Sequence, residues 1–238
     1  MLILGIDSST EVAAIALMKE NELVGEINLS LHRRHSERLM PNINHLFNEL
    51  NYDINDIDGI AVTVGPGSFT GLRIGISTVK GFAQALSVPV IGLSTLDVIA
   101  FTFNYLDGLV VPMIDARRNR VYTSLYNMKG KGKDIKERKL WEEKALSIDE
   151  LLNRLTAYDS EGSYYLTGNG VEVYKSDLQD QKIDLILTLP FMHKPRGGAV
   201  AQLGQYLLKR GNNSNIAQLV PNYLKKPQAE INFKKIGD

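Results

Sequence analysis

The 238-residue sequence contains no cysteine. This absence excludes disulfide bonds, thiolate zinc sites and cysteine nucleophiles, and it is compatible with a reducing compartment. The sequence also lacks net charge, because Lys plus Arg and Asp plus Glu number 27 each. The positive field of a protein that binds a nucleic-acid backbone alone is therefore missing, so we expect any contact with nucleic acid to be local or shared.

Long apolar runs are missing too. No stretch approaches the roughly 18 apolar residues of a membrane span, and the first residues, 1–7, lack the basic segment and cleavage site of a signal peptide. We expect a cytoplasmic protein with no membrane partner. Because 44% of the residues are apolar, the chain can bury either one large core or the cores of two lobes, and we favour two lobes.

The first half of the sequence has the pattern of a mixed α/β lobe. Three alternating or apolar segments separated by polar turns predict an antiparallel meander over 2–6, 12–18 and 23–31. Strands at 59–64 and 88–92 then alternate with helices at 36–50, 69–86 and 94–103, the last capped by Ser94. This order is typical of one lobe of the actin, sugar-kinase and chaperone ATPase superfamily. The predicted fold class is therefore a two-lobed actin-like ATPase fold with a mixed sheet and crossover helices in each lobe.

The second half restarts the same order less regularly. Strands are predicted at 109–115, 120–128 and 135–141, and helices at 147–155 and 196–210, with one strand and a glycine turn between 162 and 184. We place a boundary near Asp107, which gives an N-terminal lobe of residues 1–106 and a C-terminal lobe of residues 107–238. The tail after Asn222 is expected to be loosely held.

The most informative segment is GPGSFTGLRIG, from Gly65 to Gly75, which leaves a strand through a glycine turn and enters a helix. Such a junction exposes helix N–H groups that bind anions. However, no Lys-Ser or Lys-Thr pair follows the glycines, and the spacing of Gly65, Gly67 and Gly71 misses the dinucleotide fingerprint by one residue. Phosphate binding by this loop alone is therefore disfavoured.

The helix after this loop carries a row of small residues, Gly71, Gly75 and Thr78, beside an apolar stripe that begins at Leu72. Two glycines inside a helix cost about 1 kcal/mol each relative to alanine, so a close approach by another element should offset them. The approaching element is either helix 36–50 of the same lobe or a helix of a second protein, and the spacing does not decide between them.

No catalytic or metal centre can be assembled from the sequence. His32 and His35 are three residues apart with two arginines between them, which differs from the four-residue spacing of metalloprotease helices. No Ser-His-Asp arrangement is visible. Two polar turns remain as candidates for a shared nucleotide cleft, although plain hairpin turns explain them nearly as well: Asp7-Ser8-Ser9 in the first lobe and Asp115-Ala116-Arg117 in the second.

The glycine-rich segment resembles the signature of the TsaB family, also called YeaZ, whose members help to install threonylcarbamoyladenosine in tRNA. Similar segments follow in the family's order: LGIDSST at the start, HSERLMPNI at 35–43, DAR at 115–117 and PNYL at 221–224. The resemblance implies a non-catalytic subunit that pairs with TsaD and also works with TsaE. One departure is the sequence Arg118-Asn119-Arg120, where the family commonly has an acidic residue.

The resemblance also implies where the partners and cofactors belong. The chain would have no cofactor or metal of its own, ATP or ADP and a metal would reside in the partner subunits, and tRNA would be contacted only through the complex. Pairing through the first two long helices would form a heterodimer with TsaD, or a homodimer in its absence. The residues that would line this contact are His35, Leu39, Ile43, Phe69, Gly71, Leu72, Arg73, Gly75 and Thr78.

Two alternatives remain open. A nucleotide-using enzyme of the same fold, such as a small-molecule kinase or an ATPase, would need a phosphate turn, carboxylates for magnesium and a general base. Direct tRNA recognition would depend on Arg117, Arg118, Arg120 and the lysines between 129 and 139. Protease activity is not expected, because no nucleophile pair or metal set is visible.

Overall fold

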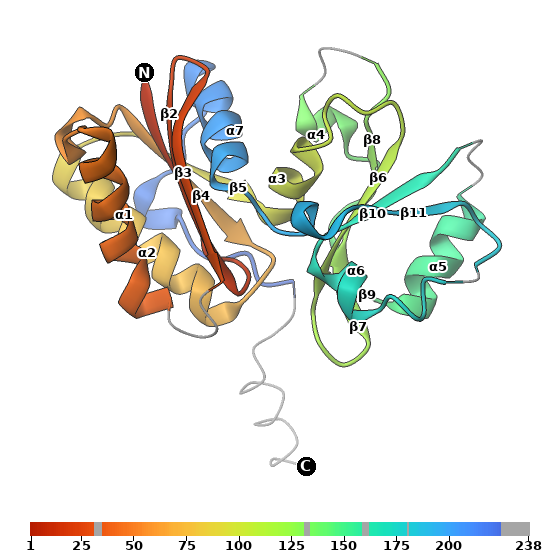
Figure 1. Ribbon diagram of the computed structural model, residues 1–238. Helices are drawn as coiled ribbons and strands as arrows, with labels where there is room; N and C mark the ends of the chain where they lie inside the picture. The colour runs from red at the N-terminus through yellow and green to blue at the C-terminus, as the bar shows by residue number, and fades with distance from the viewer. Residues whose placement is uncertain (31–34, 131–133, 159–161, 180, 225–238) are drawn as a thin grey trace.

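The computed structural model describes residues 1–30, 35–130, 134–158, 162–179 and 181–224. Two sheets with their own helices form two lobes that lie side by side (Figure 1). The first sheet has the strand order β3-β2-β1-β4-β5 and the second β11-β10-β6-β7-β9, with β8 also paired to β6. The two lobes confirm the architecture predicted from the repeated strand and helix order.

The first sheet contains the predicted meander. Its strands are β1 (Leu2–Asp7), β2 (Val12–Lys19), β3 (Glu22–Ser30), β4 (Gly59–Gly65) and β5 (Val90–Ser94). β1 pairs antiparallel with β2 and parallel with β4, so β1 is a central strand. Its residues are all buried, as expected for a strand covered on both faces.

Helices cover both faces of this sheet (Figure 1). α1 (His35–Leu50) and α2 (Phe69–Leu86) lie on one face, and α7 (Gly197–Lys209) lies on the other. A short 3-10 helix, η1 (Ile54–Asp56), precedes β4, and α3 (Thr95–Phe101) leads from β5 toward the second lobe. Helix α3 begins at the predicted cap, because the Ser94 hydroxyl accepts hydrogen bonds from the backbone N–H groups of Leu96 and Asp97.

The second lobe is built on shorter strands. These are β6 (Leu109–Asp115), β7 (Arg120–Thr123), β8 (Tyr126–Asn127), β9 (Lys144–Ser147), β10 (Tyr164–Thr167) and β11 (Leu185–Leu187). The helices are α4 (Ile135–Arg138), α5 (Ile148–Ala157), α6 (Asn169–Val173) and the 3-10 helix η2 (Pro190–Met192). The last 3-10 helix, η3 (Ile216–Gln218), follows α7.

The strand predicted at 135–141 is wrong, because residues 135–138 form helix α4. Asp134 accepts a hydrogen bond from the backbone N–H of Lys136, and Glu137 accepts one from the backbone N–H of Asp134. This reciprocal capping box stabilises a helical turn in a segment whose composition alone allowed either structure. The strand that completes this part of the sheet is β9, which pairs antiparallel with β7.

Helix α7 departs from the predicted arrangement of residues 107–238. It packs against β1, β2 and β4 of the first sheet, rather than against the second sheet. Close contact explains this position, because a Cβ atom at Gly197 would lie 2.6 Å from the carbonyl carbon of Ile15, and one at Gly204 would lie 2.2 Å from the Ala61 Cβ. The chain therefore returns to the first lobe after η2, a step that the sequence boundary near Asp107 did not include. The division at that boundary otherwise stays a prediction.

Candidate functional site

The glycine-rich segment closes over the turn between β1 and β2. Ser68 caps helix α2 by accepting a hydrogen bond from the backbone N–H of Gly71, and its own backbone N–H donates to the Ser9 carbonyl oxygen at 2.6 Å. A Cβ atom at Gly67 would lie 2.2 Å from the same Ser9 oxygen. The segment and the turn are therefore in direct backbone contact, which only glycine permits at this position.

The small-residue row of α2 packs within its own lobe. The Ser8 side-chain hydroxyl donates a 2.8 Å hydrogen bond to the Gly71 carbonyl oxygen, and a Cβ at Gly71 would lie 2.0 Å from the Ser8 backbone oxygen. A Cβ at Gly75 would lie 2.2 Å from the Ser8 hydroxyl oxygen. The close approach that the two glycines require is therefore made by the β1–β2 turn of the same lobe, and their place in a contact with a second chain stays a prediction.

The other residues predicted at the partner contact fall into a buried group and an exposed group. Leu39, Ile43 and Leu72 belong to the core of the lobe, with at most 1% of each residue exposed, and the prediction that they line an intermolecular contact stays untested. Phe69, Arg73 and Thr78 retain exposed surface on α2, and their role in partner binding stays a prediction. The side chain of His35 and all of His32 lie outside the described residues.

Asp7 is buried completely at the end of β1. One carboxylate oxygen, Oδ1, accepts hydrogen bonds of 2.6 Å from the hydroxyl groups of Ser9 and Thr63. The other oxygen, Oδ2, is buried and has no hydrogen-bond partner among the described residues. Burial raises the pKa of Asp7 to about 6, because the charged form loses its hydration, and the hydroxyl donors offset only part of this effect.

The second candidate turn lies between β6 and β7 and is organised by its own residues. The Asp115 carboxylate accepts hydrogen bonds from the backbone N–H of Arg117 at 2.8 Å and from the Tyr174 hydroxyl at 2.9 Å. Arg117, Arg118 and Asn119 all have left-handed backbone conformations, with φ between 56° and 58°. Among the described residues, no hydrogen bond or ion pair joins Asp115 or Arg117 to the Asp7 turn, so the structure gives no evidence for a cleft shared by the two turns.

A nucleotide does not fit the Asp7 turn in this arrangement. A turn that holds a phosphate needs backbone N–H groups that the anion can reach. Here Ser8 and Ser9 are at most 1% exposed, and the backbone of 67–71 covers them. No phosphate can reach the backbone of Ser8 or Ser9 unless the start of α2 moves away. No step of a reaction is derived through a nucleotide at this turn.

A polar network at the junction of the lobes was not evident from the sequence. The Lys139 amino group lies 2.9 Å from Asp97 Oδ1 and 2.8 Å from Glu143 Oε1. The Tyr126 hydroxyl donates to Asp97 at 2.7 Å, and the Ser94 hydroxyl donates to Glu143. These bonds tie α3, which follows the first sheet, to the segment between α4 and β9. Lys139 and Glu143 are four residues apart, but the other partners are 29 to 49 residues apart in sequence, a separation at which no local pattern indicates them.

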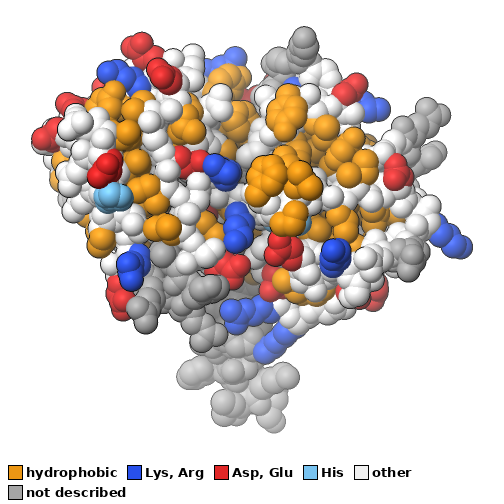
Figure 2. Space-filling view, viewed as in Figure 1, with side chains coloured by type: hydrophobic (Ala, Val, Ile, Leu, Met, Phe, Trp, Pro, Cys, Tyr) orange, Lys and Arg blue, Asp and Glu red, His pale blue; other side chains and the backbone are white. Residues whose placement is uncertain are grey.

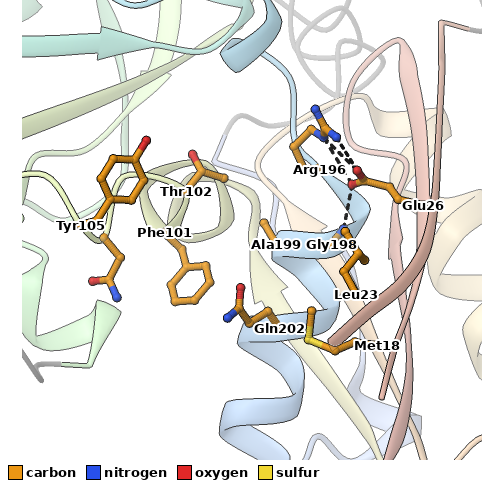
Figure 3. Close-up of a pocket in the computed structure, with 11 residues that line it drawn as sticks. Met18, Leu23, Glu26, Phe101, Thr102, Tyr105, Arg196, Gly198, Ala199 and Gln202 are labelled. Carbon is orange, nitrogen blue, oxygen red and sulfur yellow. Dashed lines mark hydrogen bonds and ion pairs between the residues drawn. The ribbon is translucent and has the colours of Figure 1, made fainter. Parts of the chain in front are cut away.

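A groove of about 510 Å³ lies between α7, β3 and the end of α3 (Figure 3). Its apolar residues include Met18, Leu23 and Phe101, and Tyr105 stands at its edge with 80% of its surface exposed. At one end, Glu26 accepts hydrogen bonds from the Arg196 guanidinium and from the backbone N–H of Gly198. The Glu26 carboxylate and the Arg196 guanidinium therefore neutralise each other, and at this end of the groove neither is free to act as a catalytic acid or base.

A second exposed apolar surface lies on η2. Leu189 and Phe191 are 60% and 66% exposed, and Figure 2 shows hydrophobic side chains gathered over this part of the molecule beside the lobe junction. Apolar surface of this kind commonly contacts another protein.

No group of three or more His, Cys, Asp and Glu side chains in the described part of the chain is arranged to hold a metal ion. None of the helices there is long and apolar enough to cross a bilayer.

Comparison with known proteins indicates a family. The family model described as TsaD, a tRNA N6-adenosine threonylcarbamoyltransferase, matches residues 22–233. The tRNA threonylcarbamoyladenosine biosynthesis protein TsaB of Bacillus subtilis is 32% identical to this chain over 240 residues, which cover 98% of both proteins. A crystal structure from Pseudomonas aeruginosa, of an uncharacterized protein with similarity to peptidase YeaZ, has a TM-score of 0.79 and 28% identity, and covers 94% of this chain and 99% of its own.

A more distant structure bears on the fold alone. Component A of the (R)-2-hydroxyglutaryl-CoA dehydratase of Acidaminococcus fermentans has a TM-score of 0.50 and 10% identity, with 89% of this chain and all of that chain covered. With the two sheets described above, this likeness confirms the predicted fold class, the two-lobed actin-like ATPase fold.

Proposed function

This chain belongs to the TsaB family, within the wider family that the TsaD model describes, and from that premise we propose that it is a non-catalytic subunit in threonylcarbamoyladenosine biosynthesis. In this role it pairs with TsaD and supports the transfer of threonylcarbamoyl to the adenosine beside the anticodon of tRNA. The match over 98% of a TsaB protein supports the pathway.

The observation that carries the non-catalytic role is the covered turn after β1. Ser8 and Ser9 are buried under the backbone of 67–71, and Asp7 has no exposed surface. A nucleotide-using enzyme needs an accessible phosphate turn and carboxylates that can reach a hydrated magnesium ion. The buried arrangement supports a structural role for this turn, which fixes the start of α2.

The cofactors then belong to the other subunits. We assign no cofactor or metal to this chain and place ATP or ADP and the metal in its partners, TsaD and TsaE. Contact with tRNA is made within the complex, because a chain without net charge has no broad positive field of its own. A homodimer forms when TsaD is absent.

Reconstitution of the modification reaction tests this proposal. Unmodified tRNA, an activated threonylcarbamoyl donor, ATP, TsaD and TsaE are combined with and without the purified chain, and modified adenosine is measured by mass spectrometry of digested tRNA. We expect little product without this chain and none when it replaces TsaD. Equal product with and without it would contradict the proposal.

The runner-up, a kinase or ATPase of the same fold, is tested on the isolated chain. We expect no ATP hydrolysis above that of a heat-inactivated sample. Hydrolysis that survives repeated purification and disappears in Asp7→Asn would favour the enzyme instead.

A further inference from the structure

The exposed start of α2 holds an arginine in one fixed orientation. The guanidinium carbon of Arg73 lies 3.9 Å from the centre of the Phe69 ring. The Arg73 Nε donates a 3.0 Å hydrogen bond to the hydroxyl group of Tyr223. Phe69 and Tyr223 stack on each other, with ring centres 4.7 Å apart and an angle of 22° between the planes. The three side chains form one cluster, which we call the Arg73 cluster.

The third member of the cluster comes from the far end of the described chain. Its position is fixed by the neighbouring backbone, since the Asn222 N–H donates a 2.6 Å hydrogen bond to the Val64 carbonyl oxygen at the end of β4. Leu219, four residues before Tyr223, is buried in the core between the first sheet and its helices. Tyr223 therefore stands on a held segment, and through its hydroxyl it restrains a side chain 150 residues away in sequence.

The fixed guanidinium has hydrogen-bonding capacity left over. Of its five N–H donors, only that of Nε has a partner within the described chain, and no described carboxylate lies within 4.0 Å of it. Two other arginines of this chain differ in this respect, because Arg196 pairs with Glu26 and Arg120 pairs with Glu150. The remaining N–H groups of Arg73 are thus available to a ligand from outside, and the usual loss of side-chain entropy on binding is reduced by the restraint.

The surroundings favour a protein ligand over a phosphate backbone. Phe69 and Tyr223 are 37% and 36% exposed, and Met40 on the neighbouring α1 is 40% exposed. Phosphate backbones are bound by several cations together, whereas Arg73 is the one cation in the first two turns of α2. An exposed arginine between aromatic rings is the composition of a protein–protein hot spot.

We propose that the Arg73 guanidinium binds a carboxylate side chain of the catalytic partner subunit through two parallel hydrogen bonds, with the Phe69 and Tyr223 rings packed around this pair. The inference rests on the proposed function, because TsaD is the partner assumed. It makes Tyr223 a positioning residue of the interface, a role that neither the glycine-rich segment nor the helix pattern assigns.

The test is the affinity of the full-length chain for TsaD from the same organism, measured by isothermal titration calorimetry. Arg73→Glu should weaken binding about 100-fold, because it places like charges together. Arg73→Lys keeps the charge but loses the planar fork, and should weaken binding about tenfold. Tyr223→Phe keeps the stacked ring but frees the guanidinium, and should weaken binding by about threefold to tenfold.

Lys175→Glu is the matched control. Lys175 is exposed in the second lobe and forms no hydrogen bond or ion pair with the described residues, so the same change of charge should alter affinity by less than about twofold. Circular dichroism melting of each variant should give the wild-type Tm within a few degrees, because all substituted side chains are at least partly exposed. A reversal of one TsaD carboxylate to arginine that restores binding of Arg73→Glu would identify the partner residue.

The outcomes separate this inference from the proposed function. If wild type binds TsaD and Arg73→Lys binds equally well, the two-bond recognition is wrong and the proposed function stands. If the variants bind TsaD normally but the assembled complex loses tRNA affinity with a steep salt dependence, the ligand is a phosphate and the inference is overturned. If wild type does not bind TsaD, the proposed function itself fails.

Discussion

The Ser8 hydroxyl group donates a 2.8 Å hydrogen bond to the carbonyl oxygen of Gly71, across the contact between the β1–β2 turn and helix α2. The backbones also approach so closely that a Cβ at Gly71 would lie 2.0 Å from the Ser8 carbonyl oxygen. This contact fixes the first turns of α2, including the face that carries Arg73. The family signature therefore acts here as a packing motif between two segments of one lobe.

Gly71→Ala is expected to destabilise the protein strongly. The added methyl group would overlap a backbone oxygen that cannot rotate away, so α2 or the β1–β2 turn must shift, at a cost of about 2–4 kcal/mol. Gly81→Ala is the matched control on the same helix, because a Cβ there meets nothing within 4 Å. It should stabilise the protein by about 0.5–1 kcal/mol through helix propensity. Urea denaturation of both variants checks the prediction, and equal stabilities would contradict it.

The loss of stability caused by Gly75→Ala should depend on the side chain at position 8. Its Cβ would lie 2.2 Å from the Ser8 hydroxyl oxygen but 3.4 Å from the Ser8 Cβ, so most of the clash comes from the hydroxyl. Ser8→Ala alone should cost about 1 kcal/mol, because the Gly71 carbonyl loses its donor. The double variant should be less destabilised than the sum of the singles by about 1–2 kcal/mol. A double-mutant cycle from denaturation curves gives this number, and additive losses would show that the hydroxyl is not the obstacle.

The glycine row also shows how far the sequence could be interpreted. The cost of two glycines in a helix correctly predicted that another element approaches α2 closely. The spacing of the glycines identifies the helix face that must carry small residues, but it carries no information on which segment approaches that face. The approaching segment is the Ser8 turn, 63 residues earlier, and neither of the two helices considered from the sequence.

The other predictions depend on whether the interactions that decide the structure are local in sequence. Ser94 was predicted as a helix cap because capping depends on residues two and three positions away, and the structure confirms it. The capping box of Asp134 and Glu137 is equally local, but the prediction from the sequence is a strand over 135–141 and does not include this cap. Interactions between lobes, such as that of Lys139 with Asp97, and the return of α7 to the first sheet depend on tertiary packing and lay beyond local patterns.

Asp7→Asn should stabilise the protein at neutral pH and not in acid. Burial raises the pKa of Asp7 from 3.8 to about 6, so the folded state binds this proton more tightly than the unfolded state does. The favourable contribution is complete below pH 3.8 and is lost as the pH rises through about 6, which corresponds to about 3 kcal/mol. Asparagine stays neutral and can still accept the hydrogen bonds of Ser9 and Thr63.

The measurement is the free energy of unfolding of both proteins at pH 4.5, 6.0 and 7.5. Asp7→Asn should exceed wild type by about 1–3 kcal/mol at pH 7.5, and the difference should shrink steadily toward pH 4.5. The contributions of other titrating groups to the free energy of unfolding cancel in this difference, because both proteins contain these groups. A variant that is less stable at pH 7.5 would show that the Asp7 carboxylate is needed in its charged form.

Lys139→Met should weaken the junction between the lobes. The lysine amino group lies within 3 Å of the carboxylates of both Asp97 and Glu143, whose side chains are only 9% and 10% exposed. Removing the cation leaves two nearly buried carboxylates without their counter-charge, which costs about 3–5 kcal/mol. Burial lowers the pKa of Lys139, but the two carboxylates raise it by more, so its folded-state pKa lies above the ordinary value of 10.5. The stabilisation is therefore fully present below pH 10.5 and is lost as the pH rises through the higher folded-state value.

Thermal melting at pH 7.5 and at successive alkaline pH values checks this prediction. The melting temperature of Lys139→Met should lie far below that of wild type at pH 7.5, and the difference should become smaller in alkali. Lys136→Met, an exposed change on α4, should melt like wild type. A Lys139→Met protein that melts at the wild-type temperature at pH 7.5 would show that this network does not stabilise the junction.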